Sequence, residues 1–168
     1  MTSEELSILA EKTVALLLSA NRSIQFLCRD TKAGGWDRMM FHELSYGTVA
    51  ICGRPVLARM IEEKLSEFGC KVLLADTVDA PSVSDADYLI NLDNGLAVDN
   101  AFFDKVKPGM IIVDAAGVPF DKTAVISALK SGKAAGFATA YAAAGTDAEL
   151  EACKNYAAFP ELGEEMRD

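Results

Sequence analysis

Residues 49–76 read VAICGRPVLARMIEEKLSEFGCKVLLAD, and this stretch decides the fold. An apolar run at 49–52 is followed by a turn, an amphipathic segment at 56–68 that stops at Gly69, a second apolar run at 72–75, and an acid. The order strand, turn, helix, strand, acid is typical of the βαβ unit that binds dinucleotides. The stretch therefore predicts a parallel pair of strands joined by a helix.

The glycine fingerprint of that unit is altered. A G-x-G-x-x-G turn uses its glycines for a tight bend, for close approach of a pyrophosphate, and for packing of helix on strand. Here the three places hold Gly53, Pro55 and Ala58. Pro55 has no N–H and places a ring where the backbone should be bare, although the start of the helix still offers other amides to a phosphate. The sequence of this turn still indicates the βαβ fold, but it indicates phosphate binding less strongly than an intact glycine fingerprint would.

Further apolar runs follow the first unit and alternate with helical segments. The runs cover residues 88–92, 110–113 and 135–139, and a helix is expected over 121–131 with Asp121 as N-cap and Gly132 as stop. Each run is continuous rather than alternating, as in parallel strands that are covered on both faces. We therefore predict an α/β fold: a doubly wound, Rossmann-like parallel sheet in three layers, with five or six strands and residues 49–52 at its centre.

An N-terminal helix and arm precede this sheet. Thr2 and Glu5 form a capping box, and apolar residues recur at helical spacing from Leu6 to Leu27, which predicts one long helix. A less regular arm follows and contains AGGWDR at residues 33–38. Five apolar side chains of the helix cannot all face one small sheet, so we expect a homodimer through the helix and arm; they are Leu16, Leu17, Leu18, Ile24 and Phe26.

The C-terminal part has weaker signals. A second capping box at Thr146 and Glu149 predicts a helix near residues 147–157, and an acidic tail after Pro160 is expected to fray. The chain is interpreted as one domain over 1–168, with the helix and arm at 1–46, a nucleotide-binding core at 47–142, and the C-terminal helix and tail at 143–168.

Composition excludes several classes of partner. The net charge is −9, with 16 basic residues scattered among 25 acids, so no nucleic-acid binding is expected. The apolar stretch at 14–18 is far shorter than the roughly 20 residues that span a bilayer, and the N-terminus is acidic, so we expect a cytoplasmic protein with no membrane contact. The four cysteines, Cys28, Cys52, Cys70 and Cys153, contain no C-x-x-C pair and are expected to be buried free thiols.

Four motifs in series carry a resemblance to a known family. They are AGGWDR at 33–38, the unit at 49–76, VKPGMIIVDAAG at 106–117 and FDKTAVISALKSGKAAG at 120–136. Together they resemble the NAD-binding domain of the D-isomer-specific 2-hydroxyacid dehydrogenases, from the first helix to about residue 142. The resemblance implies a Rossmann domain without the substrate domain of that family, NAD as cofactor, and a subunit contact through the helix and arm.

The expected cofactor site lies at the first turn and the end of the second strand. Asp76 stands 23 residues after Gly53, where an acid accepts the ribose hydroxyls of NAD and repels the 2′-phosphate of NADP. Arg54 is placed to pair with a phosphate. The candidate cofactor-binding residues are Gly53, Arg54, Val56, Leu57 and Asp76.

The resemblance also implies losses where the family does its chemistry. The arginine that binds the substrate carboxylate falls on Ala116, and the aspartate that holds the nicotinamide amide falls on Ala140. The glutamate and histidine of the proton relay fall where this chain has Ala143, Ala144 and Gly145. The loop after Leu92 is about five residues shorter than the resemblance requires. No catalytic residue is assigned.

The remaining polar candidates are interpreted as structural. His42, the one histidine, lies in the arm and is expected to be a surface or interface residue. Asp87, Asp93 and Asp114 lie near strand ends, where isolated acids are interpreted as solvated or capping groups. No metal site is predicted.

Three hypotheses of function remain. The first is a non-catalytic domain kept for assembly or for docking to a partner protein. The second is an NAD(H)-binding module, or a subunit whose substrate domain lies on another chain. The third, an active NAD-dependent 2-hydroxyacid dehydrogenase, has the fold in its favour and the residues against it.

Overall fold

A six-stranded parallel sheet forms the centre of the molecule. The computed structural model describes residues 1–140 and 147–159. Their strands lie in the order β2-β1-β3-β4-β5-β6, and every neighbouring pair is parallel. The strands are β1 (Thr48–Cys52), β2 (Lys71–Ala75), β3 (Tyr88–Asn91), β4 (Met110–Asp114), β5 (Ala134–Thr139) and β6 (Tyr156–Ala158). The predicted α/β doubly wound sheet is confirmed.

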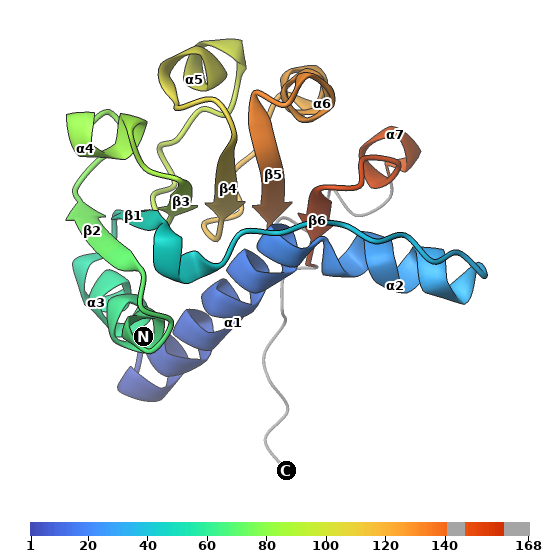
Figure 1. The fold of residues 1–168 in the computed structure, drawn as a ribbon. Coiled ribbons are helices and arrows are strands. Elements are labelled where there is room, and N and C mark those ends of the chain that lie inside the picture. The colour runs from blue at the N-terminus through green and yellow to red at the C-terminus, as the bar shows by residue number, and fades with distance from the viewer. Residues whose placement is uncertain (141–146, 160–168) are drawn as a thin grey trace.

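Helices cover both faces of this sheet (Figure 1). Their bounds are α1 (Ser3–Arg22), α2 (Ile24–Lys32), α3 (Pro55–Ser66), α4 (Pro81–Ser84), α5 (Asn100–Lys105), α6 (Lys122–Ser131) and α7 (Ala148–Glu151), with a 3-10 turn at Leu44–Tyr46. α1 and α3 lie on one face, and α4, α5 and α6 lie on the other. Each face has its own apolar core, which explains why the central strands are apolar throughout.

The position of β1 differs from the prediction. We expected residues 49–52 at the centre of the sheet, but β1 lies second from one edge. β2 pairs with one side of β1 and forms the edge of the sheet. The chain then crosses to the other side of β1, where β3 pairs with it and where β4, β5 and β6 follow in order. The point where the winding reverses therefore lies between β1 and β3.

The C-terminal helix was predicted too long. Asp147 accepts hydrogen bonds from the amides of Glu149 and Leu150, but α7 has only four residues and residues 156–158 form the edge strand β6 instead. Tyr156 stacks on Phe137 of β5, with ring centroids 6.5 Å apart. This apolar contact and the free edge of β5 favour a strand over a continued helix. Thr146 of the expected capping box and the tail from Pro160 lie outside the described residues.

The N-terminal segment forms two helices rather than one. The Thr2–Glu5 capping box is present as predicted. The helix breaks at Ser23, which has a positive φ of 47°. α1 packs on α3 and on β4 and β5, so that Leu16 and Leu17 are buried in the core of their own domain. Among residues 1–46, the large apolar side chains that remain exposed are Met1, Ile24 on α2, and Trp36, Met40 and Tyr46 in the arm.

Within the described residues, no helix combines the length and hydropathy needed to cross a membrane. The four cysteines are free thiols, as expected, but the expected burial holds only for Cys52 and Cys153. Cys28 on α2 is exposed and Cys70 is partly exposed.

Candidate functional site

Gly53 makes the sharp turn that ends β1. Its φ is +86°, and its amide donates to the carbonyl oxygen of Ala75 at 3.1 Å. A Cβ at this position would meet the Cβ and the backbone nitrogen of Asp93 at 3.1 Å. Both the positive φ and the close approach of Asp93 require glycine here. The predicted role of Gly53 in a tight bend is therefore confirmed by its backbone geometry.

The N-terminus of α3 follows this turn directly. Pro55 is the first helical residue, and Arg54 is the N-cap with a left-handed backbone, φ 42°. The amide of Ala58 is already bonded to the carbonyl of Arg54 at 2.9 Å. The amides of Val56 and Leu57 find no acceptor among residues 1–140 and 147–159. Helix N-termini carry a partial positive charge, so these two amides are the donors available to an anion.

The side chains of this helix start divide between core and solvent. Leu57 and Ala58 are buried, which anchors the helix on the sheet, while Val56 and Arg54 are exposed. The guanidinium of Arg54 has the sulfur of Met1 as its neighbour, with Nη2 and Sδ 3.3 Å apart. A sulfur is a weak acceptor. Arg54 therefore keeps its charge available at the turn.

Asp76 lies beside the same turn. The register of the sheet pairs Cys52 with Ala75, so Gly53 and Asp76 are the next residues on two adjacent strands. Asp76 is exposed. The structure thus brings all five predicted residues to the carboxyl edge of β1 and β2, although they are separated by up to 23 positions in the sequence. This edge, at the reversal of the winding, is where open α/β sheets bind ligands.

A buried polar network lies under this edge, and sequence reasoning missed it. Asn91, Asp114 and Thr139 end three adjacent strands and are fully buried. Asp114 accepts hydrogen bonds from Asn91 Nδ2 at 3.0 Å, from Thr139 Oγ1 at 3.2 Å and from the amide of Val118 at 2.8 Å. The interpretation of Asp114 as a solvated or capping group was wrong, because its carboxylate organises the chain beyond β4. The only sequence signal was an acid at the end of an uninterrupted apolar run.

Burial dominates the electrostatics of this edge. It raises the pKa of the Asp114 carboxyl, although hydrogen bonds from Asn91, Val118 and Thr139 oppose the shift. Burial and then the charge of Asp93 raise the pKa of the Cys52 thiol to about 12. Cys52 is therefore a neutral thiol at physiological pH and no nucleophile.

The three acids that we considered together do not form one site. Asp87 lies at the opposite edge, where its carboxylate accepts from Lys107 Nζ at 2.7 Å and from the amide of Thr48 at 2.9 Å. The bond from Lys107 is the largest of the effects that lower the pKa of Asp87. In the part of the chain that the structure describes, no group of three or more His, Cys, Asp or Glu residues is placed to hold a metal ion.

The positions where the resemblance implied catalytic residues hold small apolar side chains. Ala116 and Ala140 follow β4 and β5 at the carboxyl edge, and their amides are bonded to the carbonyls of Asn91 and Asp114 at 3.2 and 3.0 Å. His42 is exposed and precedes β1, so it lies at the amino edge of the sheet, away from the turn. Residues 143–145 lie outside the described residues.

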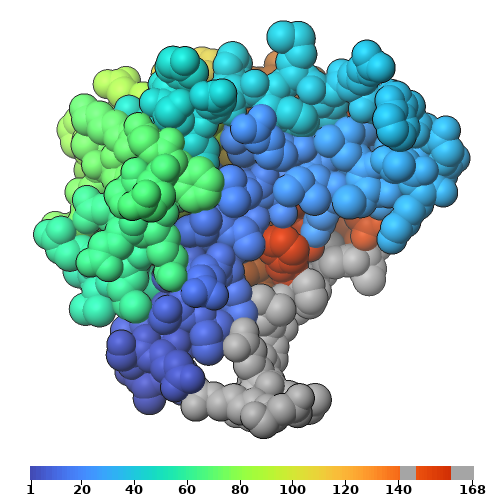
Figure 2. Space-filling view, turned by 60° about the horizontal axis from the view of Figure 1, so that its bottom comes forward, coloured from blue at the N-terminus to red at the C-terminus, as the bar shows by residue number. Residues whose placement is uncertain are grey.

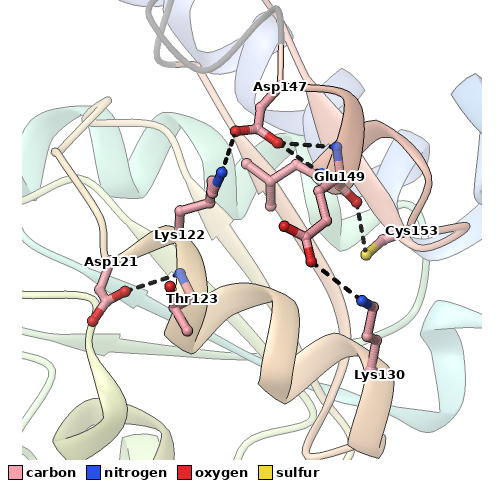
Figure 3. A network of polar contacts seen from close by, with 8 residues as sticks. Asp121, Lys122, Thr123, Lys130, Asp147, Glu149 and Cys153 are labelled. Atoms are coloured by element: carbon pink, nitrogen blue, oxygen red, sulfur yellow. Dashed lines mark hydrogen bonds and ion pairs between the residues drawn. The ribbon is translucent and has the colours of Figure 1, made fainter.

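The acids of α7 are engaged in structural contacts (Figure 3). Lys122 Nζ lies 2.7 Å from Asp147 Oδ2, and Lys130 Nζ lies 3.4 Å from Glu149 Oε1. The bond from Lys122 lowers the pKa of Asp147, and the same bond raises the pKa of Lys122. These solvent-exposed ion pairs join α7 to α6, while the buried Leu150 anchors α7 in the core, so Asp147 and Glu149 are engaged in contacts within the protein.

Comparison with known proteins agrees with this geometry. The model of the NAD-binding domain of the D-isomer-specific 2-hydroxyacid dehydrogenases matches residues 14–98. The D-3-phosphoglycerate dehydrogenase of Mycobacterium leprae is 28% identical over an alignment that covers 92% of this chain and 34% of that protein. The chain thus spans about a third of the length of that curated relative.

Solved structures show the same fold. The phosphoglycerate dehydrogenase of Lactobacillus plantarum superposes with a TM-score of 0.76 at 18% identity, over 99% of this chain and 63% of that one. The D-lactate dehydrogenase of Lactobacillus jensenii, solved with NAD+, superposes with a TM-score of 0.69 at 20% identity, over 91% of this chain and 58% of that one.

Proposed function

We propose a function that starts from the family of the protein. This chain belongs to the D-isomer-specific 2-hydroxyacid dehydrogenase family, and its residues 14–98 match the NAD-binding domain of that family. The chain binds NAD(H) at the first βα turn and does not itself transfer hydride. The observation that carries the proposal is the convergence, at one edge, of a glycine turn, an exposed acid and two amides that find no acceptor among the described residues. The alternative of an active dehydrogenase is disfavoured by Ala116 and Ala140.

The residues present fit an adenine dinucleotide. The amides of Val56 and Leu57 and the charge of Arg54 would receive the pyrophosphate, and Asp76 would accept the ribose hydroxyls. The bound cofactor would supply hydride chemistry. This chain, however, offers two methyl groups where the substrate carboxylate and the nicotinamide amide need polar partners. Binding without turnover is the result of that combination.

The first test is a titration of NAD and NADP into the wild type and Asp76→Asn. An amide is a weaker acceptor than a carboxylate for ribose hydroxyls, so we expect NAD affinity to fall about tenfold. The ratio of NAD affinity to NADP affinity should decrease, because the variant lacks the carboxylate charge that repels the 2′-phosphate of NADP. Asp104→Asn, an exposed position on α5, is the matched control and should bind like the wild type. Equal NAD affinity in all three proteins would show that Asp76 does not contribute to NAD binding.

Assembly is the second candidate, and the arm favours it. Three large apolar side chains of one segment face solvent: Trp36, Met40 and Tyr46 are 78%, 99% and 88% exposed. The segment is held by its own chain, since Lys154 Nζ lies 2.7 Å from Asp37 and Asn21 Nδ2 donates to the carbonyl of His42 at 3.3 Å. Figure 2 shows the arm and α2 together on one surface. We propose that a second copy covers this surface, with docking of another protein as the alternative occupant.

Sedimentation of the double variant Trp36→Ser, Met40→Ser tests assembly. We expect the wild type to be a dimer at roughly tens of micromolar and the variant to be a monomer with an unchanged circular dichroism spectrum, because both side chains are exposed in the protomer and loss of the dimer removes only the stability that association adds. Phe68→Ser, which removes an exposed apolar residue after α3, is the control and should remain dimeric. A monomeric wild type would refute the dimer. Leu17 is unsuitable for this test, because it is buried in its own domain.

A further inference from the structure

The chain after β3 closes over the first turn. The β1–β3 ladder continues past its last strand residues, because the amide of Leu92 donates to the carbonyl of Cys52 at 2.8 Å. The next residue, Asp93, therefore lies against Gly53, where a Cβ would come within 3.1 Å of the Asp93 side chain. Any ligand seated on the Gly53 turn has Asp93 as its neighbour.

The buried network fixes the backbone of Asp93. Its amide donates to Asn91 Oδ1 at 3.1 Å, and its carbonyl accepts from Asn91 Nδ2 at 3.0 Å. Asn91 is fully buried and is itself bonded to Asp114. The carboxylate of Asp93 is exposed and accepts from the amide of Gly95 at 3.1 Å. The position of this charge is thus built into the ends of β3 and β4.

The turn consequently carries opposed charges. Arg54 and the amides of Val56 and Leu57 attract an anion from the side of α3, while Asp93 repels it from the side of β3. The Cβ of Asp93 lies 3.1 Å from the place of a Cβ on Gly53, and like charges brought together at a protein surface repel strongly enough to change affinity severalfold.

We propose that Asp93 is a specificity-determining residue of this site, and the proposal rests on the NAD-binding function proposed above. Its carboxylate lowers the affinity of the turn for a pyrophosphate and leaves the affinity for an uncharged adenosine unchanged. The site thereby distinguishes ligands that place a negative charge at Gly53 from ligands that place no charge there. Because the repulsion acts on the ligand phosphates, its strength depends on ionic strength.

Calorimetric titration of NAD and adenosine into the wild type, Asp93→Asn and Asp104→Asn tests the proposal. Asparagine keeps an oxygen for the amide of Gly95 and leaves the backbone bonds to Asn91 in place. We expect Asp93→Asn to bind NAD roughly tenfold more tightly than the wild type at low salt, with the gain shrinking as salt is added. Adenosine affinity should not change. Asp104→Asn alters net charge by the same amount on α5 and should match the wild type.

The other possible outcomes of this titration contradict either the role of Asp93 or the NAD site itself. Equal NAD affinity of wild type and Asp93→Asn would overturn the role of Asp93 while leaving the NAD site in place. An equal gain for NAD and adenosine would overturn it too, because the cause would then be relieved packing rather than charge. Absence of NAD binding in all three proteins would overturn the proposed function together with this inference.

Discussion

Replacing Pro55 with glycine is expected to tighten NAD binding by roughly 1–3 kcal/mol, or about fivefold to more than a hundredfold. The change restores an N–H at the first position of α3, beside the amides of Val56 and Leu57, which have no acceptor in the described part of the chain, and it removes the ring from the turn. Isothermal titration of NAD into both proteins measures the gain. Proline is favourable at the first helical position, so the variant should also lose about 1 kcal/mol of folding stability.

Pro108→Gly is the control for this change, since Pro108 precedes β4 at the opposite edge of the sheet. It should leave NAD affinity unchanged. The Pro55 variant should still produce no NADH with 2-hydroxy acids, because Ala116 and Ala140 provide no polar contact for substrate or nicotinamide. Equal NAD affinity of Pro55→Gly and wild type would show that the ring and the missing N–H do not limit the site.

Asp114→Asn is expected to lower the free energy of unfolding by about 1–3 kcal/mol at neutral pH. Donors point at both carboxylate oxygens of Asp114: Asn91 Nδ2 at one, and the Val118 amide and Thr139 hydroxyl at the other. An amide presents its NH2 to one of these sets, so a buried donor loses its acceptor. Asp121→Asn is the control, because asparagine also caps a helix. Urea unfolding of the three proteins measures the difference, and an unchanged midpoint would contradict the network.

The same residue predicts a pH dependence. The folded-state pKa of Asp114 is raised, so the folded protein holds this proton more tightly than the unfolded chain does. Its stabilising contribution is fully present below the unfolded pKa of about 3.9 and is lost as pH rises through the raised folded pKa. The wild type should therefore lose stability relative to Asp114→Asn as pH rises through this window. Parallel pH profiles of the two proteins would contradict the shift.

The sequence predicted the strands because burial on both faces leaves an unbroken apolar run. Residues 110–113 were expected and Met110–Asp114 are observed, and residues 88–92 were expected where Tyr88–Asn91 are observed, with every residue of both strands buried. The edge strand Lys71–Ala75 was also expected, over 72–75, although none of its residues is buried. The break at Ser23 and the strand β6 were missed, since both involve tertiary contacts: after the break, Gln25 of α2 bonds the backbone of Ala158 in β6, and β6 pairs with the edge of β5.

The sequence predicted only those site residues whose separation along the chain is fixed by a single structural unit. Gly53 and Asp76 belong to one βαβ unit, whose length fixes their separation. The contact of Asp93 with Gly53 depends on β3 returning to pair with β1, and the network of Asn91, Asp114 and Thr139 depends on the register of three strands. Strand order is not encoded in local periodicity, so these features required the structure.

The proposed NAD site is tested most directly by following the backbone amide resonances of the labelled protein while NAD is added. We predict saturable shifts at Gly53, Val56 and Leu57, with no change at His42 or Gly109 on the opposite edge of the sheet. Saturable binding that leaves the amides of Val56 and Leu57 unmoved, or no binding at all, would contradict the account.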